Sequence, residues 1–237
     1  MVLSAAEPIA RRKLSDEVFD RLKRMITSGE VQPGDAMPSE RELMERFGVG
    51  RPAIREAMQA LAGLGLLTIN HGERARVCAL TARAVTQQVD VAARIMLATS
   101  PGSLDQLKEA RAFFERGMAR EAANRASEAD LAALRGLIDA QRAALGDAET
   151  FIAADMAFHA AIAAISGNPI FTAVSEAMLG WLKQFHTELL IWSGKENHTL
   201  AEHGTIVAAI AGRDADAAER AMERHLNRSA ALYAHHR

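Results

Sequence analysis

The sequence is poor in two features that would narrow its function at once, cysteine and long apolar runs. A single cysteine, Cys78, excludes an internal disulfide. No apolar run approaches the roughly 20 residues that cross a bilayer, and the opening residues lack the apolar segment of a secretory signal. We therefore expect a cytoplasmic protein that has no membrane partner and needs no disulfide bonds.

Neither sign of charge dominates the chain. Its 237 residues include 28 Lys and Arg and 30 Asp and Glu, for a formal net charge of −2. This balance provides no general attraction to nucleic acid, so any binding of that kind must depend on where individual arginines lie. Hydrophobic residues make up 49% of the sequence, which excludes a disordered chain and allows two modest domains, each with its own core.

Residues 38–67 read PSERELMERFGVGRPAIREAMQALAGLGLL and predict two helices joined by a tight turn. Ser39 and Glu42 have the S-x-x-E spacing of a capping box, which determines where the first helix starts. Gly48 ends that helix. Pro52 then falls in the first turn of the second helix, where its missing N–H costs nothing.

The predicted second helix has two different faces. Its apolar residues repeat at helical spacing and are Ile54, Ala57, Met58 and Leu61. Arg51, Arg55 and Gln59 repeat every four residues on another face, where the forked donors of arginine can grip a phosphate or a guanine edge. The alternative is a solvated surface on which nearby glutamates such as Glu40 pair with the arginines. One face packs in either case, and the other is available for binding.

A short hairpin follows the second helix. Residues 66–69 and 75–79 read as strands, joined across a turn at 70–73. A helix-turn-helix followed by such a hairpin is a winged helix. Upstream, the apolar stripe from Val18 to Ile26 predicts a preceding helix that is capped by Ser15.

This N-terminal stretch resembles the DNA-binding domain of GntR-family transcription regulators, whose signature is close to PSERELxxxxGVSRxxVREALxxLxxxGL. By position, Arg41, Arg51 and Arg55 are similar to the DNA-contacting arginines of the family, and Glu40 lies beside them. The His71-Gly72 tip is similar to a wing that reaches into the minor groove.

One departure from this family pattern is Gly50, where the family usually has Ser or Thr. The change removes a hydroxyl that could contact a phosphate. Together with Gln59 from the helix-face argument, the predicted DNA-binding residues are Glu40, Arg41, Arg51, Arg55, Gln59, His71 and Gly72.

From residue 81 onward the sequence is alanine-rich and helical in pattern, without strand-like alternation. Short breaks divide it into about seven helices, enough for an antiparallel bundle. The breaks lie near residues 100–102, 126–127, 146–147, 167–169, 193–194 and 212–213. We therefore predict a mainly α protein with a flexible arm at 1–10, a winged helix-turn-helix DNA-binding domain at 11–80, and a helical effector-binding and dimerisation domain at 81–237.

Polar residues interrupt the apolar stripes of three of these helices. Asp155 and His159 lie one turn apart in FIAADMAFHAAIAAI. His203 leads the apolar series of TLAEHGTIVAAI, and His225 lies on the buried side of AMERHLNRSAALY. Each histidine alone is more often a satisfied core residue. Together, one carboxylate and three imidazoles match the donors that bind a divalent metal ion, so we predict a site for Zn, with Ni or Mn as alternatives.

These helical segments also resemble the effector domain of the FadR branch of the same family. The resemblance implies that the metal would be bound by Asp155, His159, His203 and His225. Arg111 belongs to a segment similar to the E-x-R-xxx-E element near the effector cavity of the family. It could pair with an anionic effector through two parallel bonds, and an inter-helix salt bridge is an equally good interpretation.

Together these features predict a ligand-responsive transcription regulator. A small carboxylate or hydroxy acid would bind at the metal and change how a homodimer binds a palindromic operator in double-stranded DNA. The resemblance favours a repressor that the effector releases. The alternatives are a regulator whose signal is the metal itself, and a metalloenzyme fused to a DNA-binding domain. No H-E-x-x-H or comparable base-bearing motif is present, so we predict no enzyme activity.

Overall fold

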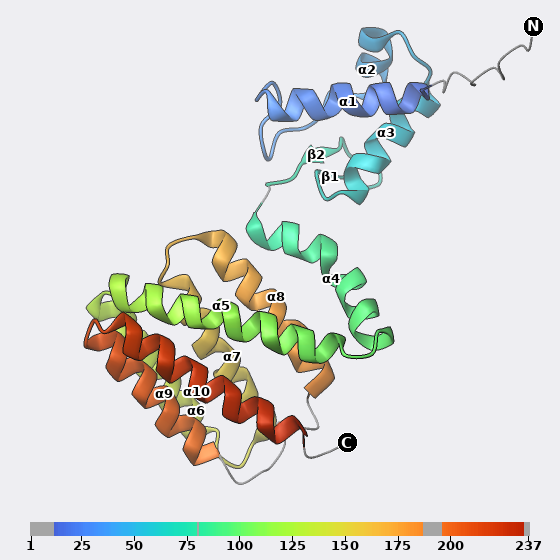
Figure 1. Cartoon of the computed structure of the whole chain (residues 1–237). Helices are drawn as coiled ribbons and strands as arrows, with labels where there is room; N and C mark the ends of the chain where they lie inside the picture. Colours follow the sequence, from blue (N-terminus) through green and yellow to red (C-terminus); the bar gives the residue numbers. More distant parts are fainter. Residues whose placement is uncertain (1–11, 80, 187–195, 235–237) are drawn as a thin grey trace, which may run out of the picture. The chain divides into compact units, whose positions relative to one another are not determined.

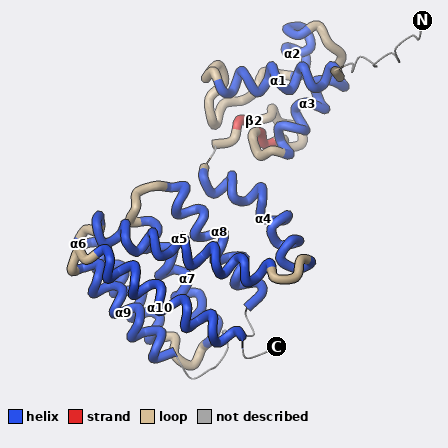
Figure 2. The backbone as a smooth tube through the Cα atoms, in the orientation of Figure 1, coloured by secondary structure: helices blue, strands red, loops and turns tan. Residues whose placement is uncertain are grey.

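The computed structural model describes residues 12–79, 81–186 and 196–234. The chain divides into two compact units, the winged-helix unit (1–84) and the helical unit (85–237). Both units consist largely of helices (Figures 1 and 2), which confirms the predicted mainly α fold. The predicted arm at 1–10 lies outside the described residues. Within the described residues, every helix is too short or too polar to cross a bilayer.

The described part of the winged-helix unit consists of helices α1 (Leu14–Thr27), α2 (Glu40–Phe47) and α3 (Arg51–Gly63) and strands β1 (Leu67–Thr68) and β2 (Arg76–Val77). The two strands pair antiparallel and are shorter than predicted. The backbone of residues 75–77 also bonds to residues 35–37, through Met37 N to Ala75 O and Val77 N to Asp35 O. The hairpin is therefore tied to the segment that leads into α2.

Local sequence sets the ends of α2 and α3. Ser39 Oγ accepts a hydrogen bond from Glu42 N, and the Glu42 carboxylate accepts one from Ser39 N at 2.7 Å, which confirms the predicted capping box. Gly48 ends α2 at a φ of +66°, a left-handed conformation that glycine adopts without strain. Pro52 lies in the first turn of α3, which begins at Arg51 as predicted.

The predicted cap of α1 is wrong. The helix begins at Leu14, so Ser15 lies inside its first turn, and the preceding Lys13 makes no side-chain cap. Ser15 is buried because it shares the inward face with Val18 and Leu22, three and seven residues further on. Its spacing along the helix therefore places it in the core rather than at the helix end.

The winged-helix unit has a continuous apolar core. The predicted inner face of α3 is buried throughout, from Ile54 to Leu61. It packs with Leu22 of α1 and Leu43 of α2, neither of which has any exposed surface. Because this face of α3 is used for packing, the opposite face is directed to solvent.

The helical unit is built from the helices that follow the hairpin. They are α4 (Ala82–Thr99), α5 (Ser103–Arg125), α6 (Glu128–Ala143), α7 (Ala148–Ala164), α8 (Pro169–His186), α9 (Glu196–Ala211) and α10 (Ala215–Ala234). These seven helices of the described chain match the predicted number. Five of the six predicted breaks fall between them, and the sixth, at 193–194, lies outside the described residues.

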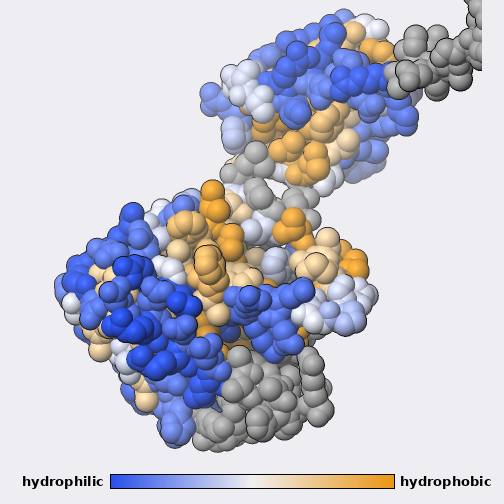
Figure 3. Space-filling view, in the orientation of Figure 1, coloured by the Kyte–Doolittle hydropathy of each residue, from blue (hydrophilic) through white to orange (hydrophobic). Residues whose placement is uncertain are grey.

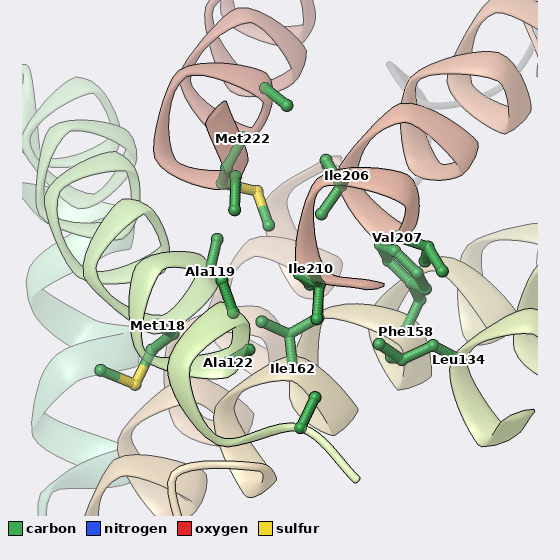
Figure 4. Close-up of a cluster of buried hydrophobic side chains, with 14 of the residues drawn as sticks. Met118, Ala119, Ala122, Leu134, Phe158, Ile162, Ile206, Val207, Ile210 and Met222 are labelled. Carbon is green, nitrogen blue, oxygen red and sulfur yellow. The ribbon is translucent and has the colours of Figure 1, made fainter. Parts of the chain in front are cut away.

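Helices α5, α6, α7, α9 and α10 enclose the main core of the helical unit (Figure 4). Phe158 and Ile162 of α7 meet Ile206 and Ile210 of α9, and all four side chains are at most 1% exposed. Met222 of α10 lies in the same cluster. The helices that carry the predicted metal ligands therefore contribute to the same core.

Candidate nucleic-acid interface and metal centre

The polar face of α3 is exposed. The side chains of Arg51 and Arg55 are 62% and 65% exposed, and Gln59 is exposed as well. Glu40, the first residue of α2, lies beside both arginines. Its Oε2 is 3.4 Å from Arg51 Nε, and its Oε1 is 3.1 Å from Arg55 Nε. One carboxylate thus holds two guanidinium groups side by side at the surface.

These ion pairs are compatible with both interpretations of the polar face of α3, the solvated surface and the nucleic-acid-binding surface. The pairing with Glu40 is the solvated arrangement that the sequence allowed. Ion pairs this exposed contribute about 0–1 kcal/mol, so a DNA phosphate or base edge can replace the carboxylate at little cost. The geometry therefore leaves Arg51 and Arg55 available for nucleic acid.

The other predicted DNA-binding residues also lie at the surface of the winged-helix unit. Arg41 pairs with Glu45 at 3.1 Å, and its side chain is 76% exposed. His71 and Gly72 are exposed at the hairpin turn, where Gly72 has a φ of +79°. All seven predicted residues thus come from α2, α3 and this turn, and all are at least partly exposed.

Helices α7, α9 and α10 bring the four predicted metal ligands together. Asp155 and His159 come from α7, His203 from α9 and His225 from α10. Each offers one ligand atom, and these atoms lie within 4.8 Å of one another. The histidines are at most 3% exposed, whereas Asp155 is partly buried. We call these four residues the metal cluster.

The spacing within the metal cluster suits one ion. His225 Nε2 lies 3.4 Å from His203 Nε2 and 3.3 Å from His159 Nε2. Asp155 Oδ1 lies 3.5 Å from His203 Nε2, and its Oδ2 lies 3.8 Å from His159 Nε2. Two ligands of a tetrahedral zinc ion with bonds of about 2.0–2.1 Å are about 3.3 Å apart.

A hydrogen-bond acceptor faces the outer nitrogen of two of these imidazoles. His203 Nδ1 lies 2.9 Å from Gln141 Oε1, and His225 Nδ1 lies 2.8 Å from Glu202 Oε2. An acceptor at Nδ1 keeps the proton there and leaves the lone pair of Nε2 directed to the centre of the cluster. These two contacts therefore favour the tautomer that a metal ligand at Nε2 requires.

Glu115 of α5 faces Nδ1 of His159, as Gln141 and Glu202 face Nδ1 of the other two histidines. Its carboxylate is 3% exposed, contacts His159 Nδ1 and accepts a hydrogen bond from Arg111 Nε. Burial alone would raise the pKa of Glu115, but Arg111 and His159 outweigh burial and hold that pKa well below its usual value. Glu115 is therefore ionised and can orient the His159 ring.

Burial also determines the charge of the ligands. It lowers the pKa of His203 far below its ordinary value and lowers the pKa of His225, although nearby carboxylates oppose both shifts. Burial would raise the pKa of Asp155, but the three histidines of the cluster outweigh it and lower that pKa. The neutral imidazoles of His203 and His225 beside the ionised Asp155 carboxylate suit a divalent ion.

Arg111 makes an ion pair within its own helix. Its Nε contacts Glu115, four residues later in α5, so this ion pair lies within one helix. The charge of Arg111 also contributes to lowering the pKa of Asp155 and of His225. Arg111 therefore acts electrostatically on the metal cluster.

None of the residues behind the ligands was predicted as a site residue, although Glu115 ends the E-x-R-xxx-E segment that contains Arg111. Glu115 and Gln141 could have been found, because each is a polar residue in a buried apolar stripe, the signal that revealed the histidines. Glu202 and Arg228 gave no such signal. They pair with each other at 2.7 Å between α9 and α10, and Glu202 is only partly buried.

Two family comparisons match one unit each. Residues 14–77 match the family described as bacterial regulatory proteins, gntR family. Residues 106–228 match the FCD domain. The first match covers the winged helix, and the second includes the whole metal cluster.

Named relatives cover nearly the whole chain. The HTH-type transcriptional repressor NanR of Salmonella schwarzengrund (strain CVM19633) is 40% identical over 228 residues, which cover 95% of this chain and 86% of the relative. The HTH-type transcriptional repressor NanR of Enterobacter sp. (strain 638) is also 40% identical over 228 residues, covering 95% of this chain and 87% of the relative.

Solved structures share the fold. Streptococcus agalactiae GntR has a TM-score of 0.64 at 24% identity and covers 90% of this chain and 98% of its own. E. coli McbR/YncC has a TM-score of 0.54 at 20% identity and covers 96% of this chain and 100% of its own. The matched families and the named relatives are transcription regulators rather than enzymes, as predicted.

Proposed function

The chain belongs to the GntR family of bacterial regulatory proteins and is a DNA-binding transcriptional repressor with an FCD domain, and we propose that a divalent metal in its helical unit binds a small organic acid that changes operator affinity. The metal cluster carries this proposal, because it places four suitable donor atoms within 4.8 Å of one another. Three of these donors are imidazole nitrogens of side chains that are at most 3% exposed.

The donor set favours zinc, with nickel or manganese as alternatives. Three imidazole nitrogens and one carboxylate oxygen are ligands that each of these ions accepts. Burial keeps His203 and His225 in the neutral state, so their nitrogens need not lose a proton before they bind an ion at neutral pH.

The charges around the metal cluster favour an anionic effector. Glu115 is paired with Arg111, and Glu202 with Arg228, so Asp155 supplies the one uncompensated negative charge among these five residues. A bound divalent ion would supply two positive charges and, if octahedral, two coordination positions beyond the four protein donors. The sum of −1 and +2 leaves a net charge of about +1, which attracts a carboxylate.

Arg111 is our candidate for a direct contact with the effector. Its side chain is 14% exposed, and its charge acts on both Asp155 and His225. A guanidinium in this position can donate to a carboxylate while Nε still bonds to Glu115. The effector would then bridge α5 and the metal cluster.

We propose that the protein is a homodimer and that α4 contributes to the interface. Val89, Val91, Ile95 and Met96 are each at least half exposed on this one helix. Hydrophobic residues are visible along α4 in Figure 3. These exposed apolar side chains favour an interaction site on α4, and a second copy of the chain is the partner we propose. A twofold dimer would match a palindromic operator.

The effector can act on DNA binding only if it binds the DNA-competent and DNA-free states with different affinity. Asp155, His159, His203 and His225 lie on three helices, so a ligand held at the metal cluster contacts a site whose parts can shift relative to one another. We propose that this shift changes the placement of the two winged helices in the dimer and releases the operator.

The proposal is tested with metal-free protein that is then loaded with Zn, Ni or Mn. Bound metal is measured by mass spectrometry, and operator binding by fluorescence anisotropy during titration with small carboxylates and hydroxy acids. His203→Ala should lose both the metal and the acid response. His198→Ala is the matched control, because His198 lies on the same helix but is exposed.

We expect an acid to weaken operator binding in the metal-loaded protein alone. Wild-type protein that holds no metal would refute the metal site. Operator binding that follows metal concentration without any acid would identify the metal as the signal and replace the effector proposal. Turnover of an added acid would point to the metalloenzyme alternative and contradict the family evidence.

A further inference from the structure

Gln141 is a fully buried glutamine on a helix that supplies no metal ligand. It lies near the end of α6 and has 0% of its surface exposed. Other buried residues of α6, such as Leu131, Leu134 and Ile138, are apolar. A buried primary amide is costly unless its donors and acceptor are satisfied, so its partners indicate why this position is polar.

Both ends of this amide bond to members of the metal cluster. Gln141 Oε1 lies 2.9 Å from His203 Nδ1, and Gln141 Nε2 donates to Asp155 Oδ1 at 3.0 Å. The orientation of the amide follows from chemistry, because a flipped amide would place its oxygen against the carboxylate oxygen. With Nε2 directed to Asp155, Oε1 accepts the Nδ1 proton of His203 and leaves His203 Nε2 for the ion.

The amide differs in charge from the groups behind the other histidines. His159 and His225 are supported by carboxylates, Glu115 and Glu202, which are held in ion pairs with arginine. Gln141 is neutral and needs no counter-charge. A carboxylate in its place could accept from His203 but would repel Asp155, and an apolar side chain would do neither. A primary amide is suited to bonding both ligands at once.

We propose that Gln141 is the positioning residue that aligns His203 and Asp155 on one metal ion without adding charge to the site. The hydrogen bond to His203 selects its tautomer, and the hydrogen bond to Asp155 sets the direction of its carboxylate. These two ligands come from different helices, and α6 joins them from a third. This inference rests on the proposed metal binding.

The test compares Gln141→Met with wild-type protein. Methionine has a similar volume and an unbranched chain, so it fills the position but makes neither hydrogen bond. We expect zinc affinity, measured by competition with a chelator, to fall roughly 10- to 100-fold. We also expect the visible spectrum of the cobalt-loaded protein to change, because the ligand geometry around the ion changes.

A third measurement uses metal-free protein. Nitrogen chemical shifts should show His203 of the wild type protonated at Nδ1, and Gln141→Met should lose this preference. Leu134→Met is the matched control, since Leu134 is a 1% exposed residue of the same helix that contacts the core instead. The control should leave zinc affinity, the cobalt spectrum and the His203 tautomer as in the wild type.

The outcomes separate this inference from the proposed function. If wild-type protein binds no zinc or cobalt, the proposed metal site fails. If wild-type protein binds metal and Gln141→Met keeps the same affinity and cobalt spectrum, the positioning role is refuted. If Gln141→Met and Leu134→Met weaken metal binding equally, the effect comes from core packing and the inference is equally refuted.

Discussion

Each unit contains an arginine–glutamate pair four residues apart on one helix, and the two pairs differ in burial. Arg41 and Glu45 of α2 lie 3.1 Å apart with side chains 76% and 65% exposed. Arg111 and Glu115 of α5 are 14% and 3% exposed. Water and salt screen the charges of the first pair. The second pair is buried, so its two charges are compensated by each other rather than by water. The same two residue types thus serve a replaceable surface contact and a fixed internal support.

The contrast extends to the whole of the two candidate sites. On the winged-helix unit, Glu40 pairs with Arg51 and Arg55 at the exposed surface, where ion pairs are weak. In the helical unit, each histidine of the metal cluster is held from behind by a buried or partly buried acceptor. The exposed ion pairs of the winged-helix unit can exchange partners, whereas the hydrogen-bonded interior of the helical unit holds its side chains in one geometry.

The largest expected effect comes from removing one member of the buried Arg111–Glu115 ion pair. Arg111→Ala removes the guanidinium that pairs with the buried Glu115 carboxylate and should lower the free energy of unfolding of the helical unit by about 3–5 kcal/mol. Arg41→Ala removes an exposed partner and should change stability by less than about 1 kcal/mol. Urea unfolding followed by tryptophan fluorescence reports on the helical unit, since both tryptophans lie in residues 85–237.

Stability of the winged-helix unit in Arg41→Ala is followed by hydrogen exchange of the α2 amides. Equal losses from Arg41→Ala and Arg111→Ala would break the comparison, because burial would then make no difference to the two pairs.

Metal removal should have the next largest effect, and only on one unit. At a metal concentration 100 times the dissociation constant, binding stabilises the native state by about 2.7 kcal/mol. For a unit of this size, that corresponds to a change in Tm of roughly 5–10 °C. Calorimetry with and without a chelator should move the transition of the helical unit and leave that of the winged-helix unit in place.

The control for metal removal is a His159→Ala, His225→Ala double variant, in which the chelator should have no effect. A chelator that shifts both transitions of the wild type, or one that still shifts the double variant, would refute the assignment of the metal to this cluster.

The sequence predicts those features of the two units that depend on local patterns of residues. The start of α3 at Arg51 follows from a glycine and a proline within a few residues, and the capping box at Ser39 follows from one spacing. The four candidate metal ligands stand out in the sequence because a polar side chain in an apolar stripe has a high cost, whatever the arrangement of the helices.

The remaining features depend on contacts between distant residues. Glu202 lies behind His225 because α9 and α10 pack together, and no spacing between residues 202 and 225 reveals this. Ser15 has the sequence signature of a cap, yet the inward face of α1 takes it into the core. Gln141 met the same criterion as the histidines, so a uniform search for polar residues in buried stripes would have found it.

The recognition face should respond to single substitutions without loss of fold. Arg55→Ala should weaken operator binding by about 1–3 kcal/mol, because an arginine fork that bonds a base or phosphate is lost. Circular dichroism should be unchanged, since Arg55 is 65% exposed. Arg142→Ala is the control for the change in charge, because Arg142 is an exposed arginine of the helical unit.

An operator affinity in Arg55→Ala equal to that of the wild type would remove α3 as the recognition helix. An equal loss in Arg142→Ala would show instead that total charge, rather than the position of the arginine, governs binding.

The smallest effect tests whether the two units respond separately, with one capping box in each. Ser39 caps α2 together with Glu42, and Ser127 caps α6 together with Asp130. Ser39→Ala and Ser127→Ala should each cost about 1 kcal/mol, because each leaves a helix N–H without its side-chain acceptor. Hydrogen exchange should show increased opening of α2 alone in Ser39→Ala and of α6 alone in Ser127→Ala. If either substitution increases hydrogen exchange in both helices, the two units unfold together. The difference between the exposed ion pairs and the buried site would then not result from separate stabilities of the two units.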